Sequence, residues 1–266
     1  MASLLSKAKY QLVAMRYRGR GDRIVQTRYR GCPMLVRANE DVGQLIIAGI
    51  YETEDLGHLL ENLKDRDVFV DVGANTGLFS LLCAHRFPSV SIHAFEPVPL
   101  NASLFESSIH LNGFENITLN RSCVGNTEGE IELSLASDSA YSSMIATGRK
   151  PVVRRLRTRT ITLDSYASRA GLARIDILKV DVEGAEKLVL EGARGLLGDE
   201  RTRPRLVLVE LFDQNLQPFG TSIAEIVELL AAQGYQGYVL DKGRRRSLMP
   251  SHYNEIYNVF FELEKP

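Results

Sequence analysis

The sequence predicts an α/β protein with a doubly wound, seven-stranded sheet and a small N-terminal elaboration. From residue 44 onward, short apolar runs alternate with segments of helical periodicity, which is the pattern of βαβ units around a mainly parallel sheet. The 266 residues suffice for one such domain plus an appendage, and 44% apolar with 24% charged residues is ordinary for a globular protein. We therefore expect an elaboration over residues 1-43 and a main domain over residues 44-266.

The N-terminal elaboration begins with a predicted amphipathic helix over residues 3-18. Apolar residues recur there at near-helical spacing, with basic residues between them: Leu4, Leu5, Ala8, Leu12 and Met15. Residues 23-37 then predict a hairpin, because apolar residues lie on either side of Gly31-Cys32-Pro33.

Basic residues dominate this elaboration, although the whole chain has a net charge of only -1. Residues 1-37 hold nine Lys and Arg residues and the single acid Asp22. Such an arm can lie on an anionic membrane surface, meet a phosphorylated substrate, or form a solvated face. A second basic run covers residues 149-159. Neither run has the interleaved aromatic residues of a stacking platform, so we do not expect nucleic acid as a partner.

Cellular location follows from what the sequence lacks. It contains no apolar stretch long enough to span a bilayer, and residues 1-20 have no signal-peptide pattern. Cys32, Cys83 and Cys123 are odd in number and widely spaced, which indicates reduced thiols instead of a disulfide framework or a zinc site. We expect a cytoplasmic protein, with peripheral membrane contact through the basic arm as the open alternative.

The main domain has a regular series of elements. Strands are expected at residues 68-71, 91-95, 117-120, 175-180, 206-211, 237-240 and 257-261. Helices are expected at residues 53-64, 77-86, 98-111, 184-197 and 221-233. Residues 121-162 interrupt the series with an alternating stretch and a Ser-rich region, which predict an inserted hairpin and a mobile loop.

A glycine-bearing turn joins the first strand to a helix. The segment DVGANTG (residues 71-77) follows a buried strand and precedes the helical residues 78-82. Small residues let the backbone approach a ligand, and the helix N-terminus offers unpaired N–H groups. The next strand ends at Glu96, where a carboxylate can accept hydrogen bonds from two ribose hydroxyls. Together these features predict a nucleoside-containing cofactor.

The spacing within the turn favours one cofactor over others. A dinucleotide site has the pattern Gly-x-Gly-x-x-Gly, but position 75 here is Asn, and a Walker ending is absent. Asp71 would repel a pyrophosphate but suits a cationic amino-acid group. S-adenosylmethionine, with its sulfonium and ammonium groups, therefore fits better than NAD or ATP.

At this point the sequence resembles the FkbM family of S-adenosylmethionine-dependent methyltransferases. The resemblance covers about residues 50 to 212 and rests on five segments: DVGANTG, AFEP, LNRSCVGNTEGEIELSL, TLDSY and ILKVDVEGAEKLVLEGA. It implies a class I methyltransferase sheet with an antiparallel last strand. It also implies transfer of a methyl group to a hydroxyl oxygen.

The resemblance assigns roles to individual residues. It implies that Gly73, Asn75 and Gly77 lie against the methionine part of the cofactor and that Glu96 binds its ribose. Residues 122-125 follow the third strand, where such enzymes contact the adenine, and a Ser-rich stretch at Ser139, Ser142 and Ser143 matches a segment that closes over the cofactor. The expected cofactor contacts are Asp71, Gly73, Ala74, Asn75, Thr76, Gly77, Glu96, Pro97, Cys123, Val124, Ser142, Ser143 and Asp181.

The catalytic candidates follow the fourth strand. Asp181 and Glu183 lie at the carboxyl end of that strand, where open α/β sheets bind ligands. Either carboxylate can take the proton of an attacking hydroxyl or position the acceptor, whereas the alternative for Asp181 is that it orients a loop or the cofactor amine. Lys179 precedes Asp181 by two positions, so both side chains share one face of the strand. Glu52 and Glu210 are second-rank candidates.

No metal site is predicted from the five histidines, because they show no ligand spacing, and a divalent ion bound by acids alone stays open. The leading hypothesis is therefore an O-methyltransferase acting on a small-molecule or glycan acceptor, specifically a sugar, glycolipid or polyketide-like metabolite. An NAD or nucleotide-sugar oxidoreductase is one alternative, which the missing middle glycine disfavours. A non-catalytic cofactor-binding scaffold is another, which the intact Glu96, Asp181 and Glu183 disfavour.

Overall fold

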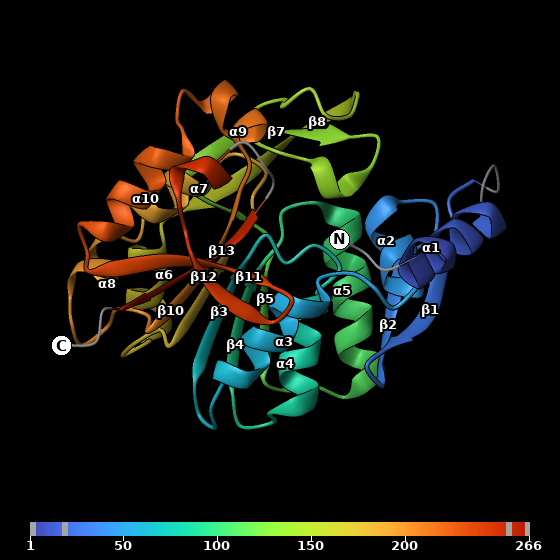
Figure 1. Cartoon of the computed structure of the whole chain (residues 1–266), viewed down its shortest axis with the longest axis horizontal. Coiled ribbons are helices and arrows are strands. Elements are labelled where there is room, and N and C mark those ends of the chain that lie inside the picture. The colour runs from blue at the N-terminus through green and yellow to red at the C-terminus, as the bar shows by residue number, and fades with distance from the viewer. Residues whose placement is uncertain (1–3, 18–20, 254–256, 264–266) are drawn as a thin grey trace.

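In the computed structural model, which describes residues 4–17, 21–253 and 257–263, an eight-stranded sheet forms the centre of the molecule (Figure 1). Its strand order is β12-β11-β13-β10-β9-β3-β4-β5. The bounds are β3 Val68–Val72, β4 Ser91–Phe95, β5 Ile117–Asn120, β9 Ile177–Val180, β10 Leu206–Leu211, β11 Tyr235–Asp241, β12 Arg244–Ser247 and β13 Tyr257–Leu263. Five neighbouring strands run parallel, in the order β10-β9-β3-β4-β5, and β13 lies antiparallel between β10 and β11. The predicted doubly wound α/β fold is confirmed.

All seven expected strands lie in this sheet, and β12 is an eighth that the sequence did not predict. β12 has the sequence Arg-Arg-Arg-Ser, and all four residues are exposed, so no apolar alternation marks it. A two-residue turn creates the strand: Lys242 and Gly243 have φ angles of 53° and 73°, and Asp241 pairs with Arg244. Two consecutive residues with positive φ make the type of turn that suits a tight hairpin.

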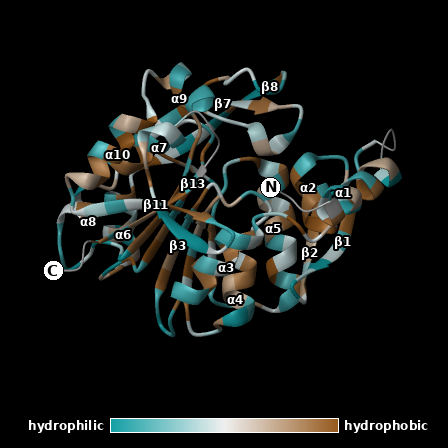
Figure 2. Ribbon diagram, viewed as in Figure 1, coloured by the Kyte–Doolittle hydropathy of each residue, from teal (hydrophilic) through white to brown (hydrophobic). Residues whose placement is uncertain are grey.

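Helices cover both faces of the sheet, as Figure 1 shows. One face carries α3 Thr53–Asn62, α4 Leu78–Arg86 and α5 Pro99–Asn112. The other carries α6 Leu163–Ala170, α7 Glu186–Glu191, α8 Arg194–Gly198 and α10 Ile223–Ala231. Neighbouring residues of β3 point to opposite faces, so Phe69 packs in the first layer and Val70 in the second. The strands are accordingly apolar on both faces, as the hydropathy colours in Figure 2 show.

The helix expected at residues 184-197 is two helices, α7 and α8. Gly192 separates them and packs against the insertion: a Cβ atom there would stand 2.0 Å from the Gly125 carbonyl oxygen. The Asp164 carboxylate then accepts hydrogen bonds from the N–H groups of Gly195 and Leu196, at 2.8 and 2.9 Å. This side-chain cap starts a new helix. Asp164 belongs to α6, a helix that the sequence did not predict.

The N-terminal region consists of α1 Leu4–Tyr17, the hairpin β1 Ile24–Tyr29 and β2 Cys32–Arg37, and α2 Asp41–Ile47. The hairpin shares the core of the main sheet, since Cys32 and Met34 are buried and the Leu35 N–H donates to Ser108 Oγ of α5. The expected boundary between residues 43 and 44 falls inside α2. Residues 3 and 18 of the expected first helix lie outside the described residues. No described helix combines the length and apolar character needed to cross a membrane.

The insertion after β5 is a three-stranded sheet of order β6-β8-β7. Its strands are β6 Cys123–Val124, β7 Gly129–Ala136 and β8 Val152–Ile161, and the 3-10 turn η1 Ser139–Tyr141 lies between β7 and β8. The predicted hairpin is present, but β8 runs through the basic run of residues 149-159, which the sequence did not identify as a strand. Cross-strand acids explain this, because Arg159 pairs with Glu130 and Arg157 with Glu132.

The remaining short elements follow β10 and β12. They are α9 Asp213–Leu216, η2 Gln217–Phe219 and η3 Pro250–His252. α9 and η2 lie next to the carboxyl end of β10. This end of the sheet, covered by η1 of the insertion, holds the main cavity of the described residues.

Candidate active site

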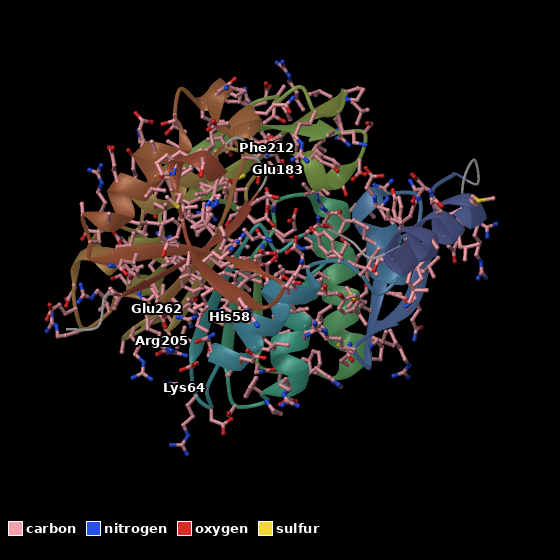
Figure 3. All side chains as sticks on the ribbon, viewed as in Figure 1. His58, Lys64, Glu183, Arg205, Phe212 and Glu262 are labelled. Atoms are coloured by element: carbon pink, nitrogen blue, oxygen red, sulfur yellow. The ribbon has the colours of Figure 1, made fainter. Side chains whose placement is uncertain are left out.

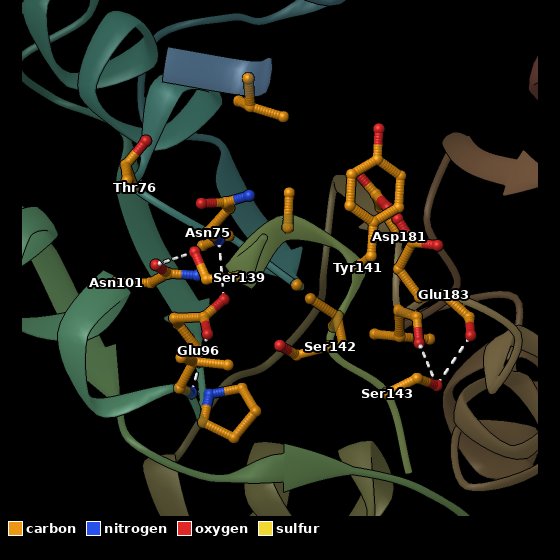
Figure 4. Close-up of a pocket in the computed structure, with 18 of the residues that line it drawn as sticks. Asn75, Thr76, Glu96, Asn101, Ser139, Tyr141, Ser142, Ser143, Asp181 and Glu183 are labelled. Atoms are coloured by element: carbon orange, nitrogen blue, oxygen red, sulfur yellow. Dashed lines mark hydrogen bonds between the residues drawn. The ribbon is translucent and has the colours of Figure 1, made fainter. Parts of the chain in front are cut away.

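The cavity lies at the carboxyl ends of β3, β4, β9 and β10, and η1 forms part of its wall (Figure 4). Its empty space is about 1250 Å³, a volume that includes the open mouth. Most of the residues that the sequence singles out line it: Gly73, Ala74, Asn75, Thr76, Glu96, Pro97, Cys123, Val124, Ser142, Ser143, Lys179, Asp181 and Glu183. The remaining two, Asp71 and Gly77, lie behind the cavity wall.

The glycine-bearing turn forms one side of the cavity. Gly73, Asn75 and Gly77 have φ angles of 80°, 54° and 83°, which favour glycine or asparagine. The N–H groups of Gly73 and Ala74 both donate to the Phe95 carbonyl oxygen at 3.0 Å. These hydrogen bonds tie the turn to the end of β4.

Gly77 allows α4 and α5 to pack closely. A Cβ atom at Gly77 would stand 2.1 Å from the Phe105 ring of α5, so only glycine lets α4 start this close to α5. Gly77 does not line the cavity, and its contact with the cofactor stays a prediction.

Glu96 occupies the end of β4, where the sequence predicts a ribose-binding acid. It is 4% exposed, and its two oxygens accept hydrogen bonds from the N–H groups of Asn75 and Val98, both at 2.8 Å (Figure 4). Burial raises the pKa of Glu96 to about 7, although those two N–H groups lower it. The carboxylate is thus fixed in place on the cavity wall beside the turn.

Asp71 has a supporting position beneath the turn. It is 0% exposed, and its Oδ2 accepts a hydrogen bond from Ser80 Oγ at 2.7 Å. Its Oδ1 lies 3.5 Å from Lys179 Nζ and has no hydrogen-bond partner among the described residues. Asp71 does not line the cavity, and its direct cofactor contact stays a prediction.

Lys179 connects Asp71 to Asp181. Its Nζ donates to Asp181 Oδ2 at 3.0 Å and lies 5.1 Å from the centre of the Phe79 ring. Burial lowers the pKa of Lys179, but the charges of Asp181 and Asp71 outweigh that effect and raise it above its usual range. The expectation that Lys179 and Asp181 share one face of β9 is confirmed. Asp181 keeps 28% of its side chain exposed and borders the cavity.

Glu183 lies in a tight turn after β9. Its φ is 57°, an uncommon value for a residue other than glycine. Arg149 and Asn215 both donate to Glu183 Oε2, at 2.8 and 2.7 Å, and Ser143 Oγ donates to the Glu183 carbonyl oxygen at 2.7 Å (Figure 4). Burial raises the pKa of Glu183 to about 8, although Arg149 lowers it.

Glu186 stabilises this turn from below. It is 1% exposed, and its Oε1 accepts hydrogen bonds from the N–H groups of Val182 and Gly184, both at 3.1 Å. The turn therefore holds Asp181 and Glu183 in a set geometry, which a site for precise chemistry requires.

Glu210 and Glu52, second-rank candidates in the sequence, also line the cavity. Glu210 lies near the end of β10, and its buried Oε2 has no hydrogen-bond partner among the described residues. Burial raises the pKa of Glu210 well above its usual range, and the charge of Asp181 adds to the effect. Burial and the nearby Asp55 raise the pKa of Glu52 to about 8.

The insertion supplies residues that the sequence did not identify. Arg149 lines the cavity, and its guanidinium lies 4.4 Å from the centre of the Tyr141 ring and 5.1 Å from that of Phe212. Figure 3 shows Phe212 beside Glu183, the partner of this arginine. No motif marks Arg149, because its role depends on the folding of the insertion over β9 and β10. Ser142 is held by the Ala136 N–H, which donates to its Oγ at 3.1 Å.

The three cysteines are free and buried, as expected for reduced thiols. Cys123 lies at the adenine-side wall that the sequence predicts, together with Val124 of β6. These two side chains give that part of the cavity an apolar surface.

Comparison with known proteins identifies methyltransferases. A protein described as 31-O-demethyl-FK506 methyltransferase FkbM, from Streptomyces tacrolimicus, is 26% identical over 65% of this chain and 74% of its own length. The 2-O-methyltransferase NoeI of Sinorhizobium fredii is 25% identical over 63% of this chain and 72% of that protein. The hexuronic acid methyltransferase AglP of Haloferax volcanii is 28% identical over 52% and 55%.

Solved structures of methyltransferases also match. Precorrin-6y C5,15-methyltransferase from Geobacter metallireducens aligns with a TM-score of 0.47 and 14% identity, over 81% of this chain and 90% of that one. The SAM-dependent methyltransferase of Agrobacterium tumefaciens aligns with a TM-score of 0.47 and 12% identity, over 91% and 70%.

The family described as Methyltransferase FkbM domain matches residues 71–236, which contain the glycine-bearing turn, Glu96 and the segment from Lys179 to Glu183. The chain is a methyltransferase and belongs to the FkbM family.

Proposed function

We propose that the cavity binds S-adenosylmethionine and that the enzyme transfers the methyl group to a hydroxyl oxygen of a sugar, glycolipid or polyketide-like metabolite. One observation carries this proposal: a single cavity joins the turn at Gly73 and the carboxylate of Glu96 to a group of acidic side chains at the ends of β9 and β10. The first part suits a nucleoside with an amino-acid tail. The second suits an acceptor that must lose a proton.

The residues present fit this cofactor. Gly73 has no room for a side chain, so its backbone forms the wall directly, and Glu96 offers its remaining lone pairs to ribose hydroxyls. Lys179 and Arg149 are each bound to a carboxylate, so neither is available to hold a pyrophosphate. The carboxylates favour the sulfonium and ammonium groups of S-adenosylmethionine and disfavour NAD, whose pyrophosphate gives it a net negative charge.

The chain's own residues orient the acceptor and take its proton. When bound, S-adenosylmethionine supplies an electrophilic methyl group. Asp181 accepts a hydrogen bond from the acceptor hydroxyl and removes its proton as the oxygen attacks. Lys179 holds Asp181 in position through its 3.0 Å contact. Tyr141 and Ser142 on the insertion exclude water from the reacting atoms, and this lining makes orientation of the two reactants effective.

The acceptor class draws on the relatives. One relative is named a 2-O-methyltransferase, and another is named for hexuronic acid, a sugar that bears hydroxyl groups. The chain covers 55% to 74% of the lengths of these relatives, so their acceptors enter here only as a proposal.

Methyl transfer from labelled S-adenosylmethionine tests the proposal. Purified protein is incubated with the labelled donor and a panel of sugars, glycolipids and polyketides, and the products are analysed by mass spectrometry. We expect the label on a hydroxyl oxygen, and we expect the Asp181→Asn variant to leave the same acceptor unlabelled. Label on nitrogen or carbon acceptors only, with every hydroxyl compound unchanged, would contradict the proposed chemistry.

We also propose that the enzyme works in the cytoplasm and meets anionic membrane surfaces through α1. Leu5, Leu12 and Met15 of α1 are 68% to 72% exposed, and the cations Lys9 and Arg16 are exposed on the same helix. Exposed apolar side chains and cations on one helix suit a surface of anionic lipid.

Vesicle sedimentation tests this contact. We expect the protein to pellet with phosphatidylserine vesicles but not with phosphatidylcholine vesicles, and the double variant Leu12→Ser Met15→Ser to stay in the supernatant. Leu111→Ser, which changes an exposed leucine of α5, is the matched control. Equal pelleting of the double variant and the wild type would dismiss the membrane contact.

A further inference from the structure

The ends of β9 and β10 bring three carboxylates together. Asp181, Glu183 and Glu210 each offer an oxygen, and these three oxygens lie within 4.8 Å of one another. Asp181 and Glu183 come from the turn after β9, whereas Glu210 lies 27 positions further on, so no sequence spacing reveals the group. The sequence leaves open a divalent ion bound by acids alone, but its spacing does not indicate which acids.

The protein donors near these carboxylates leave part of the group unused. Lys179 donates to Asp181 Oδ2, and both Arg149 and Asn215 donate to Glu183 Oε2. The other oxygen of each carboxylate lies outside these hydrogen bonds.

Glu210 supplies an independent observation. Its Oε2 is buried, has no hydrogen-bond partner among the described residues, and belongs to a side chain that lines the cavity. A buried carboxylate oxygen without a donor is costly for a protein to keep, because burial removes its hydration. Neither Lys179 nor Arg149 reaches it in the structure, so an ionised Glu210 needs another cation to offset that cost.

We propose that Asp181, Glu183 and Glu210 bind one divalent cation of the oxygen-preferring class, such as Mg²⁺, Mn²⁺ or Ca²⁺. The geometry permits it, because the three oxygens lie within 4.8 Å of one another, and two oxygens that bind one calcium ion at about 2.4 Å are at most about 4.8 Å apart. An all-carboxylate set selects hard cations over zinc or copper.

The charges agree with this assignment. Three carboxylates face the two cations Lys179 and Arg149, and the buried Asp71 adds a further negative charge beside Lys179. A divalent ion between the three carboxylates would neutralise this excess of negative charge. At the cavity wall, the ion would also coordinate an acceptor hydroxyl beside Asp181. That role rests on the proposed function, whereas binding of the cation to the three carboxylates does not.

Manganese binding to the metal-stripped protein tests the site without cofactor or acceptor. Free Mn²⁺ is measured by electron paramagnetic resonance during titration, and Mg²⁺ and Ca²⁺ are added as competitors. We expect one Mn²⁺ per chain. We expect Glu210→Gln to weaken binding by about 10- to 100-fold or more, while its circular dichroism spectrum and melting temperature show that it folds.

Glu96→Gln is the matched control, because it changes a buried carboxylate of the same cavity outside the three-residue group. It should bind Mn²⁺ like the wild type. If Glu210→Gln fails to fold, Asp181→Asn decides in its place with the same expected loss. Absence of stoichiometric Mn²⁺ binding by the wild type overturns the inference, and so does unchanged binding by the decisive variant. A chain that binds S-adenosylmethionine but no Mn²⁺ contradicts this inference alone and leaves the proposed function standing.

Discussion

Gly73 lies so close to Asp181 that a Cβ atom on Gly73 would stand 1.7 Å from the Asp181 carbonyl oxygen. The two residues follow neighbouring parallel strands, where Val72 pairs with Val180. The turn that faces the proposed cofactor and the residue proposed to accept the proton are therefore parts of one packed unit. A substitution at one of these residues should therefore displace the backbone of the other.

Substitution of Gly73 by alanine tests this packing. The new methyl group meets the Asp181 backbone, and the φ of 80° is strained for alanine, so we expect a loss of at least about 2 kcal/mol in the free energy of unfolding. Gly113→Ala is the control, because Gly113 has a similar φ of 66° and open space around it. It should cost about 1 kcal/mol.

Denaturant unfolding followed by circular dichroism measures both variants. Equal losses for Gly73→Ala and Gly113→Ala would show that only the backbone conformation matters at Gly73. The close approach to Asp181 would then have no energetic consequence.

A second prediction concerns Lys179, because its buried ammonium group balances the negative charges of two carboxylates. Its replacement by methionine keeps most of the unbranched stem but leaves Asp71, which is 0% exposed, without its cation. We expect a loss of about 3–5 kcal/mol in the free energy of unfolding. Lys187→Met removes a more exposed ion pair with Glu225 and should cost about 1 kcal/mol or less. Similar thermal shifts for the two variants would contradict the supporting role of Lys179.

Much of this arrangement is readable in the sequence because it is local. The turn from Asp71 to Gly77, the acid at Glu96 and the pair Lys179 and Asp181 each belong to one strand and the residues that directly follow it. The alternation of strands and helices then brings the strand ends to one edge of the sheet. This logic predicts the cavity without any knowledge of side-chain packing.

What the sequence does not predict depends on contacts between distant segments. The sequence does not predict β8, because its arginines lie opposite acids of β7 only in the folded protein. Arg149 reaches Glu183 across 34 positions. Asp71 matches a family motif, but its contacts with Ser80 and Lys179 form only when β3, α4 and β9 pack together.

The pKa of Glu96 predicts how cofactor affinity depends on pH. Burial raises this pKa to about 7, so the free protein holds Glu96 protonated below pH 7 and ionised above it. The ionised form accepts hydrogen bonds from both ribose hydroxyls, so affinity for S-adenosylhomocysteine should rise between pH 6 and pH 7 and level off above it. Because one group titrates, the affinity can change by at most about tenfold per pH unit.

Isothermal titration at several pH values measures this dependence. Glu96→Gln should bind more weakly and lose this part of the pH response, because glutamine does not titrate. A pH profile shared by the variant and the wild type would assign the dependence to another group.

Asp181→Asn separates proton removal from cofactor binding. Asparagine keeps the shape of the side chain but cannot take a proton, so kcat should fall by about 10²- to 10⁴-fold. Affinity for S-adenosylhomocysteine should change little. Asp241→Asn, at the exposed turn between β11 and β12, is the matched control and should leave kcat unchanged. A nearly normal kcat for Asp181→Asn would mean that Asp181 only orients the turn or the cofactor amine.

Calorimetry with three ligands tests the central claim most directly. The purified chain is titrated separately with S-adenosylmethionine, S-adenosylhomocysteine and NADH. We predict one binding site for each sulfur compound, competition between the two, and no heat of binding with NADH. Binding of NADH together with no response to either sulfur compound would contradict the assignment of the cavity to S-adenosylmethionine.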